Sequence, residues 1–384
     1  MNKRVRMIAI YLPQYYPTET NNKIWGKGFT EWTNVAKAVP LFRGHYQPRI
    51  PRDLGFYDLR LPIVREEQAA LAEKYGIEGF CYWHYWFGNG IMELEKPLEE
   101  ILKEGKPDFP FCVGWANHSW STSTWNAVRK ERNAITFLEQ KYPGIEDIVD
   151  HFNYLLPAFK DKRYLKVDGK PIFVVFDPDS IPNSSEMISI WNDLAIQNGL
   201  EGIFFVGRME TADLHEKRKE IASGENATRK KEKLLSQHFN AVYSVPVQAL
   251  KTLDSNAISV FARRVFQHFG VNMFVEKHDY RRILKYMFSD LDYDENVFPQ
   301  VMPHWDNTPR RGRNGYVYTN EAPSLFYEQI ISAIEHVKDK TADHRIVFIN
   351  SWNEWGEGNY LEPDLKYGTA YLEQVAKAVL KDEG

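Results

Sequence analysis

The feature that most constrains the fold of this chain is a regular alternation of short apolar runs with longer amphipathic segments. The apolar runs lie at residues 5–12, 79–86, 109–116, 171–176, 202–206, 241–247, 299–305 and 346–349. Helices are expected at residues 61–75, 92–103, 145–159, 185–198, 277–287, 326–337 and 371–380, where apolar residues recur three or four positions apart. Strand alternating with helix about eight times predicts a (β/α)8 barrel, with an open doubly wound sheet as the alternative.

Two stretches depart from this alternation. Residues 14–57 are rich in Pro, Gly and aromatic residues and are expected to form a long irregular loop, which in a compact domain is usually functional. Residues 211–238 are densely charged with both signs, which predicts an exposed helical insertion, with a polyanion contact as the minority alternative. No linker rich in Pro or Ser divides the sequence, so residues 1–384 are expected to form a single catalytic domain.

Composition argues against several kinds of partner. The net charge is −4 over 384 residues, so the chain lacks the excess of basic residues that is typical of proteins that bind nucleic acid. No stretch approaches the roughly 18 apolar residues of a membrane span. The basic N-terminus precedes an apolar run, as in a leader peptide, but Pro13 and Gln14 interrupt the run, which favours a first strand.

Cysteine usage indicates the redox compartment. Cys81 and Cys112 each fall in a predicted core strand, where a free thiol packs as a small apolar group. Two cysteines do not make a disulfide framework, so a reducing, cytoplasmic location is expected. A sequence from which a leader peptide had been removed would show the same features.

Two glutamates directly follow the last apolar run. Glu354 and Glu357 lie in a stretch that also contains Trp352 and Trp355. Two carboxylates held together in a poorly solvated place repel each other, so the pair is expected to share one proton near neutral pH, which supplies one acid and one base. The alternative is a pair of solvated loop acids, the usual state of an arbitrary E-x-x-E. The tryptophans and the position after a buried strand favour catalysis.

The other polar and aromatic candidates lie past the predicted strands, where a barrel carries its active site. Of the 11 tryptophans only Trp191 lies on a predicted helix, and Trp83, Trp120 and Trp125 lie at strand ends or in the loops after them. A mouth lined with aromatic rings suits sugars, and a protein-interaction surface is the alternative. The predicted substrate-binding residues are Tyr11, Gln14, Trp25, Glu31, Trp32, Tyr82, His84, Trp86, Trp115, Asn117, His304, Trp305, Asp306, Asn353 and Trp355.

The sequence lacks several motifs that mark other chemistries. The sequence has no H-E-x-x-H and no paired histidines four residues apart, and no calcium-type loop is recognised. It also lacks the G-x-S-x-G nucleophile elbow, and Gly26-Lys-Gly28 lacks the rest of a phosphate-loop spacing. We therefore expect neither a metal nor a cofactor, and a carbohydrate as the substrate.

Five longer stretches carry a family resemblance. They are YLPQYYP (11–17), WGKGFTEWTNV (25–35), HYQPRIPRDLGFYDLR (45–60), GFCYWHYWF (79–87) and SWNEWGEGNYLEPD (351–364). Together they closely resemble the WbsX-type proteins, relatives of glycoside hydrolase family 99 that are often labelled lipopolysaccharide glycosyltransferases. The resemblance runs from the first predicted strand to the last helix.

This resemblance implies a (β/α)8 barrel that cleaves α-linked mannose-like residues within a bacterial or mannan-type polysaccharide, with retention of configuration. The N-E-W-x-E-G motif of family 99 is matched at Asn353, Glu354, Trp355, Glu357 and Gly358. Carried over, Glu354 is the base that deprotonates the sugar 2-hydroxyl, which forms a 1,2-anhydro sugar. Glu357 is the acid for the leaving oxygen and then the base for water. The sequence departs from family 99 at Gly356, where a bulkier residue is expected, and in residues 25–57.

Three functions follow from these observations. The leading one is a retaining, endo-acting glycoside hydrolase. The second is a glycosyltransferase or transglycosylase in lipopolysaccharide O-antigen biosynthesis, and it is disfavoured because no nucleotide-binding glycine fingerprint and no metal-binding D-x-D is recognised at a strand end. The third is a sugar-binding protein, which is disfavoured because adjacent acids repel each other without catalytic benefit.

Overall fold

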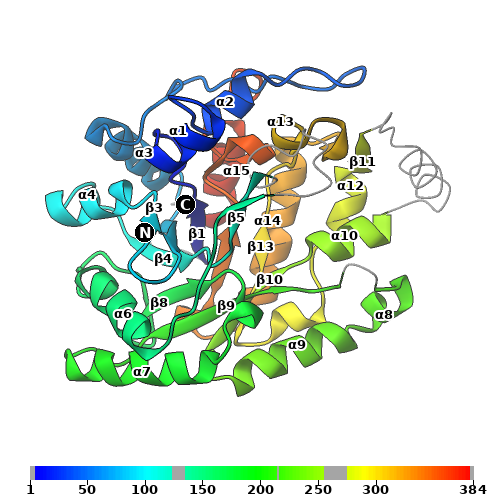
Figure 1. The fold of residues 1–384 in the computed structure, drawn as a ribbon. Helices are drawn as coiled ribbons and strands as arrows, with labels where there is room; N and C mark the ends of the chain where they lie inside the picture. Colours follow the sequence, from blue (N-terminus) through cyan, green and yellow to red (C-terminus); the bar gives the residue numbers. More distant parts are fainter. Residues whose placement is uncertain (1–4, 123–134, 214–215, 255–274, 381–384) are drawn as a thin grey trace.

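The computed structural model describes residues 5–122, 135–213, 216–254 and 275–380, and a barrel of parallel strands lies at its centre (Figure 1). The barrel strands are β1 (Arg6–Tyr11), β2 (Gly79–Trp86), β4 (Phe111–Trp115), β8 (Lys170–Val175), β9 (Phe204–Glu210), β10 (Ala241–Val245), β12 (Val297–Phe298), β13 (Gln300–Val301) and β15 (Ile346–Ile349). They follow one another in the order β12-β10-β9-β8-β4-β2-β1-β15-β13, and each neighbouring pair is parallel.

One short segment closes the barrel. β12 pairs with β10 through Val242 and Val297, and β13 pairs with β15 through Val301 and Ile349. Pro299 separates β12 from β13, and its carbonyl still accepts a hydrogen bond of 2.9 Å from the Phe348 amide. Because residues 297–301 therefore act as one strand between β10 and β15, the predicted (β/α)8 barrel is confirmed.

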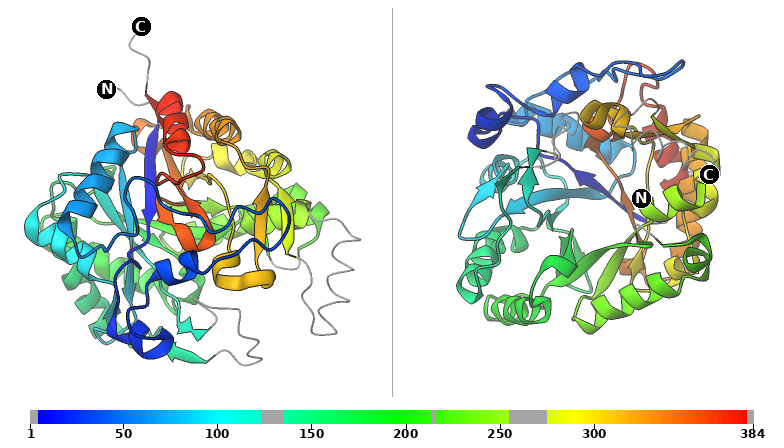
Figure 2. Two further views of the ribbon diagram at one scale, coloured as in Figure 1. Left: turned by 90° about the horizontal axis from the view of Figure 1, so that it is seen from above. Right: turned by 45° about the vertical axis from the view of Figure 1, so that its right-hand side comes forward.

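Helices surround these strands (Figures 1 and 2). The outer helices are α3 (Pro62–Lys74), α4 (Lys96–Glu104), α6 (Ile145–Phe159), α7 (Ser184–Gln197), α9 (Glu225–Ser236), α10 (Val247–Asp254), α14 (Pro323–Val337) and α15 (Ala370–Val379). α14 illustrates why they form: Pro323 occupies its first turn, and Phe326, Ile330 and Val337 make a fully buried stripe against β13 and β15.

The segment after β1 differs from its prediction. Residues 14–57 contain two short helices, α1 (Glu19–Trp25) and α2 (Glu31–Ala36), so the expected irregular loop is wrong in this part. The Thr18 side chain accepts from the Asn21 amide at the start of α1, and Thr30 and Thr33 form a capping box at the start of α2. These caps are signals that composition alone hides. α2 carries Glu31 toward the barrel axis, as its contacts below show.

Short strands extend the loops at the barrel rim. β3 (Met92–Glu93) pairs with β2, β7 (Lys166–Val167) pairs with β8, β5 (Trp120–Ser121) pairs with β6 (Thr136–Leu138), and β11 (Glu276–Asp279) pairs with β14 (Tyr316–Thr319). The helix predicted at residues 277–287 is thus only partly right, because its first residues belong to β11 and α12 is confined to Tyr280–Ile283.

The charged segment 211–238 contains α8 (Arg218–Ser223) and α9, which lie between β9 and β10 in the chain. Ala227 and Leu234 of α9 are buried, while most of its charged residues are exposed or half-buried. The division of the chain into one domain with an insertion stays a prediction. Among the described residues, no helix is both long enough and apolar enough to span a bilayer.

Candidate active site

The two glutamates of the N-E-W-x-E-G motif lie on a tight hairpin at the end of β15. β16 (Asn353–Glu354) pairs antiparallel with β17 (Asn359–Tyr360), and the 3-10 turn η6 (Trp355–Glu357) connects them. The Asn353 amide group fixes this hairpin to β1, because its Oδ1 accepts from the Leu12 amide at 2.8 Å and its Nδ2 donates to the Leu12 carbonyl at 3.0 Å.

Trp355 anchors the turn between the two glutamates. Its ring stacks on Tyr360 with the centroids 3.6 Å apart, and its Nε1 donates to Glu362 Oε2 at 2.6 Å. Glu362 also accepts from Gln68 at 2.7 Å and from Tyr57 at 2.9 Å. Asn353 and Trp355, predicted to bind substrate, instead hold the backbone that presents Glu354 and Glu357.

A single arginine joins three glutamates at the barrel mouth. Arg310 lies on the short helix α13 (Thr308–Arg311) and is buried. Its Nη2 is 2.6 Å from Glu354 Oε1, its Nη1 is 3.1 Å from Glu357 Oε1, and its Nε is 2.9 Å from Glu31 Oε1. We call Glu31, Glu354, Glu357 and Arg310 the glutamate cluster. It brings together two predicted catalytic residues and one predicted binding residue.

The charges of the glutamate cluster do not balance when all its members are ionised, because one guanidinium faces three carboxylates. Burial raises the pKa of Glu354 well above its ordinary value, Glu357 and Glu31 raise it further, and Arg310 opposes this. The Glu354 side chain is 12% exposed and that of Glu357 is 26% exposed. Burial and the neighbouring carboxylates thus favour the protonated form of Glu354, while Arg310 favours its carboxylate form.

Gly356 lies where only a glycine fits. A Cβ at this position would lie 1.7 Å from Glu31 Oε1 and 2.8 Å from Arg310 Nε. Both distances are far below van der Waals contact. The glycine therefore makes room for Glu31 in the glutamate cluster.

Asp306 orients α13 and with it Arg310. Its Oδ1 accepts from the Thr308 amide at 3.0 Å, and its Oδ2 contacts His45 Nε2 and Gln47 Nε2, each at 2.7 Å. These contacts lower the pKa of the Asp306 carboxyl against the opposing effect of its burial. Asp306 was predicted to bind substrate, and its partners show that it holds the protein together.

The neighbouring predicted residues His304 and Trp305 are also buried. His304 Nδ1 lies against the Gly358 carbonyl and is 3.2 Å from Arg49 Nη1, and burial together with Arg49 lowers the pKa of His304. Trp305 stacks on Tyr316 with the ring centroids 5.3 Å apart.

The three residues of β2 that were predicted to bind substrate point away from the barrel interior. Tyr82, His84 and Trp86 point toward the helix layer, where His84 Nε2 is 3.0 Å from His151 Nε2 of α6 and burial lowers the pKa of His84 to about 3. Trp86 stacks on His151 with the centroids 4.7 Å apart and donates to Asp147. Their assignment to substrate binding is therefore wrong.

The same error affects two other strands. Tyr11 of β1 donates to Gln68 Oε1 of α3 at 2.7 Å, and Trp115 of β4 donates to the Trp86 carbonyl at 2.9 Å and packs edge-on against His151. Both side chains fill the space between strands and helices. The run GFCYWHYW is aromatic on both faces, so its sequence did not show which face points inward.

The inward face of β2 supplies a residue that the sequence prediction missed. Tyr85 is buried, and burial together with the charges of Glu354 and Glu31 raises its pKa, which indicates that it lies near the glutamate cluster. Trp83 is on the same face and is half-buried, edge-on to Phe176 at 5.6 Å. Arg310 was also missed, since nothing in the sequence distinguishes it from Arg311.

The remaining predicted residues have different environments. Gln14 is fully buried, its backbone carbonyl accepts from the Glu31 amide at 3.0 Å, and neither side-chain amide atom has a partner among the described residues. Asn117 exchanges hydrogen bonds with the backbone of Asp177, which joins the loops after β4 and β8. Trp25 packs against Phe29 at 5.7 Å.

The tryptophans do not form the open aromatic mouth that was predicted. Trp32, Trp86, Trp115, Trp120, Trp305, Trp352 and Trp355 are each 8% exposed or less, while Trp25 and Trp83 are half-buried. Trp32 packs against Trp355 at 5.6 Å and donates to the Tyr57 carbonyl. These rings support the loops around the site because large apolar surfaces pack there. Trp125 lies outside the described residues.

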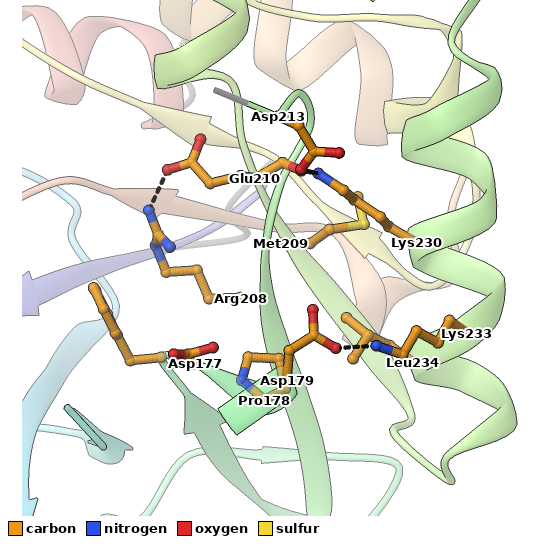
Figure 3. A pocket seen from close by; sticks show the side chains of 11 residues that line it. Asp177, Pro178, Asp179, Arg208, Met209, Glu210, Asp213, Lys230, Lys233 and Leu234 are labelled. Carbon is orange, nitrogen blue, oxygen red and sulfur yellow. Dashed lines mark hydrogen bonds and ion pairs between the residues drawn. The ribbon is translucent and has the colours of Figure 1, made fainter. Parts of the chain in front are cut away.

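A charged cavity of about 320 Å³ opens at the ends of β8 and β9 (Figure 3). Arg208 pairs with Glu210 at 2.5 Å and lies over the Phe176 ring at 4.6 Å. Asp177-Pro178-Asp179 lines the other side, so a D-x-D sequence does follow β8. Within the described ranges, no group of three or more His, Cys, Asp or Glu side chains is arranged to hold a metal ion.

The chain forms a (β/α)8 barrel with two glutamates after its last strand. Together with its similarity to known proteins, this places it in the class of barrel enzymes that act on carbohydrates. The family described as "Glycosyltransferase WbsX" matches residues 7–375. This chain therefore belongs to the WbsX family.

Relatives and solved structures extend this picture. Two WxcX proteins from strains of Xanthomonas campestris pv. campestris are 33% and 32% identical over 380 residues, which cover 98% of this chain and 50% of each relative. The chain thus spans about half the length of these relatives. In structure, it is similar to a glycoside hydrolase-like protein, with 13% identity, a TM-score of 0.58 and coverage of 98% and 94% of the two chains. It is also similar to the family 99 endo-α-mannosidase of Bacteroides thetaiotaomicron, with 14% identity, a TM-score of 0.53 and coverage of 97% and 95%.

Proposed function

We propose that this chain is a retaining glycoside hydrolase that cleaves α-linked mannose-like residues within a polysaccharide. The observation that carries the proposal is the glutamate cluster, in which Arg310 holds Glu354 and Glu357 together and burial raises the pKa of Glu354. Two carboxyls held together in one enclosed site are what acid and base catalysis by a glycosidase requires.

In the first step, the Glu354 carboxylate takes the proton from the sugar 2-hydroxyl. The freed oxygen attacks the anomeric carbon, and the Glu357 carboxyl protonates the departing glycosidic oxygen, which forms a 1,2-anhydro sugar. In the second step, the Glu357 carboxylate takes a proton from water, which attacks the anomeric carbon. Glu354 returns its proton to the 2-oxygen, so the two inversions give net retention.

The electrostatics of the cluster suit these roles. A carboxylate of raised pKa is the stronger base toward a hydroxyl, and hydroxyls are weak acids. Arg310 contacts both acids, so it limits this rise and keeps a usable fraction of Glu354 ionised. Glu31 adds a third negative charge beside them and favours retention of one proton in the cluster.

The test is hydrolysis by the purified chain. Incubation with α-mannans and bacterial surface polysaccharides is expected to release new reducing ends, and Glu354→Gln and Glu357→Gln are expected to reduce the rate by about 10³-fold or more. Glu73→Gln, at an exposed position on α3, is the matched control. Activity of Glu357→Gln on a substrate with a poor leaving group would sink the acid role, and cleavage of a 2-O-methyl substrate would sink the base role.

The second candidate is transfer of the sugar to an acceptor hydroxyl instead of water. Two observations favour it: the family's description as a glycosyltransferase, and the D-x-D sequence Asp177-Pro178-Asp179 at the end of β8. Incubation with nucleotide sugars and an acceptor glycan distinguishes the two reactions. Transfer without any release of reducing ends would replace the hydrolase proposal.

A further inference from the structure

A second cavity lies beside β11 and β14. It has a volume of about 450 Å³ and is enclosed by residues 42–49, by β11 and β14, and by Lys366. Four segments far apart in the sequence therefore build it. Its size is within the range of small-molecule sites and is sufficient for a sugar unit with a substituent.

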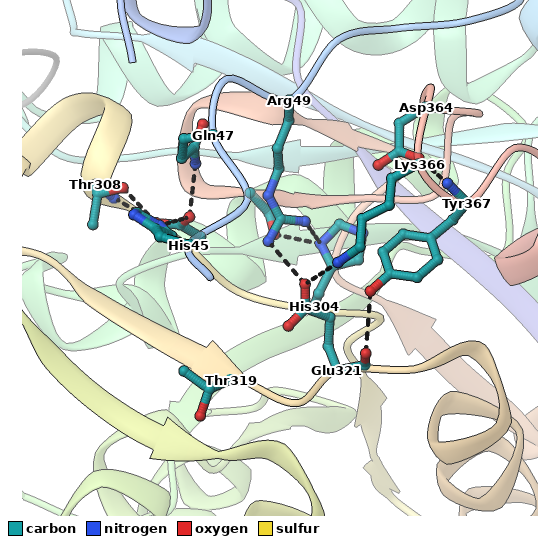
Figure 4. A network of polar contacts seen from close by, with 12 residues as sticks. His45, Gln47, Arg49, His304, Thr308, Thr319, Glu321, Asp364, Lys366 and Tyr367 are labelled. Atoms are coloured by element: carbon teal, nitrogen blue, oxygen red, sulfur yellow. Dashed lines mark hydrogen bonds and ion pairs between the residues drawn. The ribbon is translucent and has the colours of Figure 1, made fainter. Parts of the chain in front are cut away.

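The lining of this cavity is strongly cationic. Among the described residues, Arg43, Arg49, Lys277 and Lys366 face a single carboxylate, that of Glu321. Glu321 Oε1 is 3.5 Å from Arg49 and 3.7 Å from Lys366, and Figure 4 shows both side chains converging on it. These separations are longer than a close ion pair, so Glu321 neutralises the two cations only in part.

The other two cations, Arg43 and Lys277, are exposed side chains at the edge of the cavity. Among the described residues, neither Arg43 nor Lys277 lies within ion-pair distance of a carboxylate, and residues 255–274 contain no Asp or Glu. Lys277 Nζ instead lies 4.8 Å from the Phe42 ring. Cations held at a cavity wall without partners attract an anion, because the field inside a concave surface is focused.

Arg49 is a built-in part of this wall. Its side chain is 2% exposed, it lies 5.5 Å from the Tyr46 ring, and its Nε has no hydrogen-bond acceptor among the described residues. A guanidinium presents five N–H donors, and His304, Glu321 and Tyr360 take only part of this capacity. The protein therefore holds a rigid, incompletely satisfied cation here.

Aromatic rings lie beside these cations. Lys366 Nζ is 4.8 Å from the Tyr46 ring, and Phe42 stacks on His45 with the centroids 4.3 Å apart. Phe42, His45 and Tyr46 all line the cavity. A sugar can stack on such rings while an acidic substituent meets the ammonium and guanidinium groups.

The cavity is linked directly to the catalytic hairpin. His45 lines it and is 2.7 Å from Asp306, whose amide donates to the Glu357 carbonyl at 2.8 Å. On the Arg49 side, His304 contacts both Arg49 and the Gly358 carbonyl. A saccharide unit bound in the cavity would therefore lie beside the loop that carries the catalytic acid.

We propose that this cationic cavity binds an acidic sugar, one that carries a carboxylate or a phosphate group, within the polysaccharide that the enzyme processes. The inference rests on the proposed function, because it assumes that a glycan occupies the barrel mouth. It adds that the natural glycan is anionic.

Calorimetric titration of the Glu357→Gln variant of this chain tests this without turnover. The probes are glucuronate, mannose 6-phosphate, inorganic phosphate and methyl α-mannoside. We expect the two acidic sugars to bind at least about tenfold more tightly than the neutral glycoside, with an affinity that falls as salt rises. Lys277→Gln and Lys366→Gln are each expected to weaken this binding about tenfold, the loss expected for one charged contact.

The controls separate charge from folding. Lys103→Gln, at an exposed position on α4, should leave binding unchanged, and Lys366→Arg should retain most of it. Equal binding of acidic and neutral sugars, or full affinity in the Lys277→Gln, Lys366→Gln double variant, would overturn the inference. Tight binding of inorganic phosphate without either acidic sugar would also overturn it.

The outcome is independent of the hydrolase assay. Binding of acidic sugars by a chain that cleaves no polysaccharide would contradict only the proposed function. Cleavage of neutral mannan together with the absence of acidic-sugar binding would contradict only this inference. If the chain both cleaves a polysaccharide and binds acidic sugars, its preference between glucuronate and mannose 6-phosphate shows whether the substituent is a carboxylate or a phosphate.

Discussion

Arg310 Nη2 lies 2.6 Å from Glu354 Oε1, and the same guanidinium also contacts Glu31 and Glu357. Because Arg310 is buried, these contacts are weakly screened by solvent. The positive charge of Arg310 therefore offsets the repulsion among the three carboxylates, and it lowers the pH at which Glu354 ionises.

Replacing Arg310 is expected to move the acidic limb of the pH–rate profile. Arg310 lowers the pKa of Glu354, so Arg310→Gln should raise it further and shift the acidic limb to higher pH by about one unit or more. Arg310→Lys should shift it less, because the charge remains while the forked geometry is lost. kcat/KM measured from pH 4 to pH 9 gives the result. Arg311→Gln, at the exposed neighbouring position, should leave the profile in place, and an unshifted limb in Arg310→Gln would contradict the role of Arg310.

Gly356→Ala is expected to disrupt the glutamate cluster. The new methyl group would lie 1.7 Å from Glu31 Oε1, so Glu31 or the hairpin has to move. We expect a loss of about 1–3 kcal/mol in the free energy of unfolding, measured by urea denaturation, and a large loss of activity. Gly207→Ala is the control, because the nearest atoms to its Cβ would be Leu234 Cδ1 at 3.2 Å and Phe239 Cδ1 at 3.3 Å, which need to move by only a few tenths of an ångström.

The double variant Glu31→Ala, Gly356→Ala tests the cause of this loss. If the clash with Glu31 is responsible, removal of that carboxylate should recover part of the stability, so the two changes should not be additive. Additive destabilisation would show that Gly356 is required for another reason.

Glu362 is expected to make the protein less stable as pH rises. Burial raises its pKa to about 7, while Trp355, Gln68 and Tyr57 donate hydrogen bonds to it. The folded state therefore binds this proton more tightly than the unfolded state, and stability is lost as pH rises from about 4.5 to 7. Compared with Glu362→Gln, the wild type should lose about 3 kcal/mol between pH 4.5 and pH 8. Urea denaturation at both pH values measures this, with Glu73→Gln as the exposed control.

His84 is expected to act in the opposite direction. Its pKa falls to about 3 in the folded protein, because burial disfavours its charged form, so only the unfolded state takes up its proton below about pH 6.5. Compared with His84→Gln, the wild type should lose about 2 kcal/mol of stability between pH 7.5 and pH 5. Denaturation at both pH values measures this difference. His238→Asn is the matched control, since His238 is exposed, and an equal loss in both variants would show that His84 does not cause it.

Much of the fold was accessible from the sequence. The apolar runs located all eight barrel segments, including the last strand, Ile346–Ile349, which leads into the N-E-W-x-E-G motif. The motif itself drew attention to Glu354 and Glu357, and Glu31 was also named. What the sequence did not indicate was that these three carboxylates share Arg310, because their positions in the chain are far apart.

The sequence by itself determined the barrel and the place of the acidic motif, because burial of strands and helices leaves a periodic trace along the chain. Only the tertiary structure decided which face of β2 points inward, where Tyr85 rather than His84 approaches the glutamate cluster. It also determined that residue 356 has to be a glycine and which cations meet in the second cavity. These features depend on the distances between segments that are remote in sequence, and a local pattern does not contain that information.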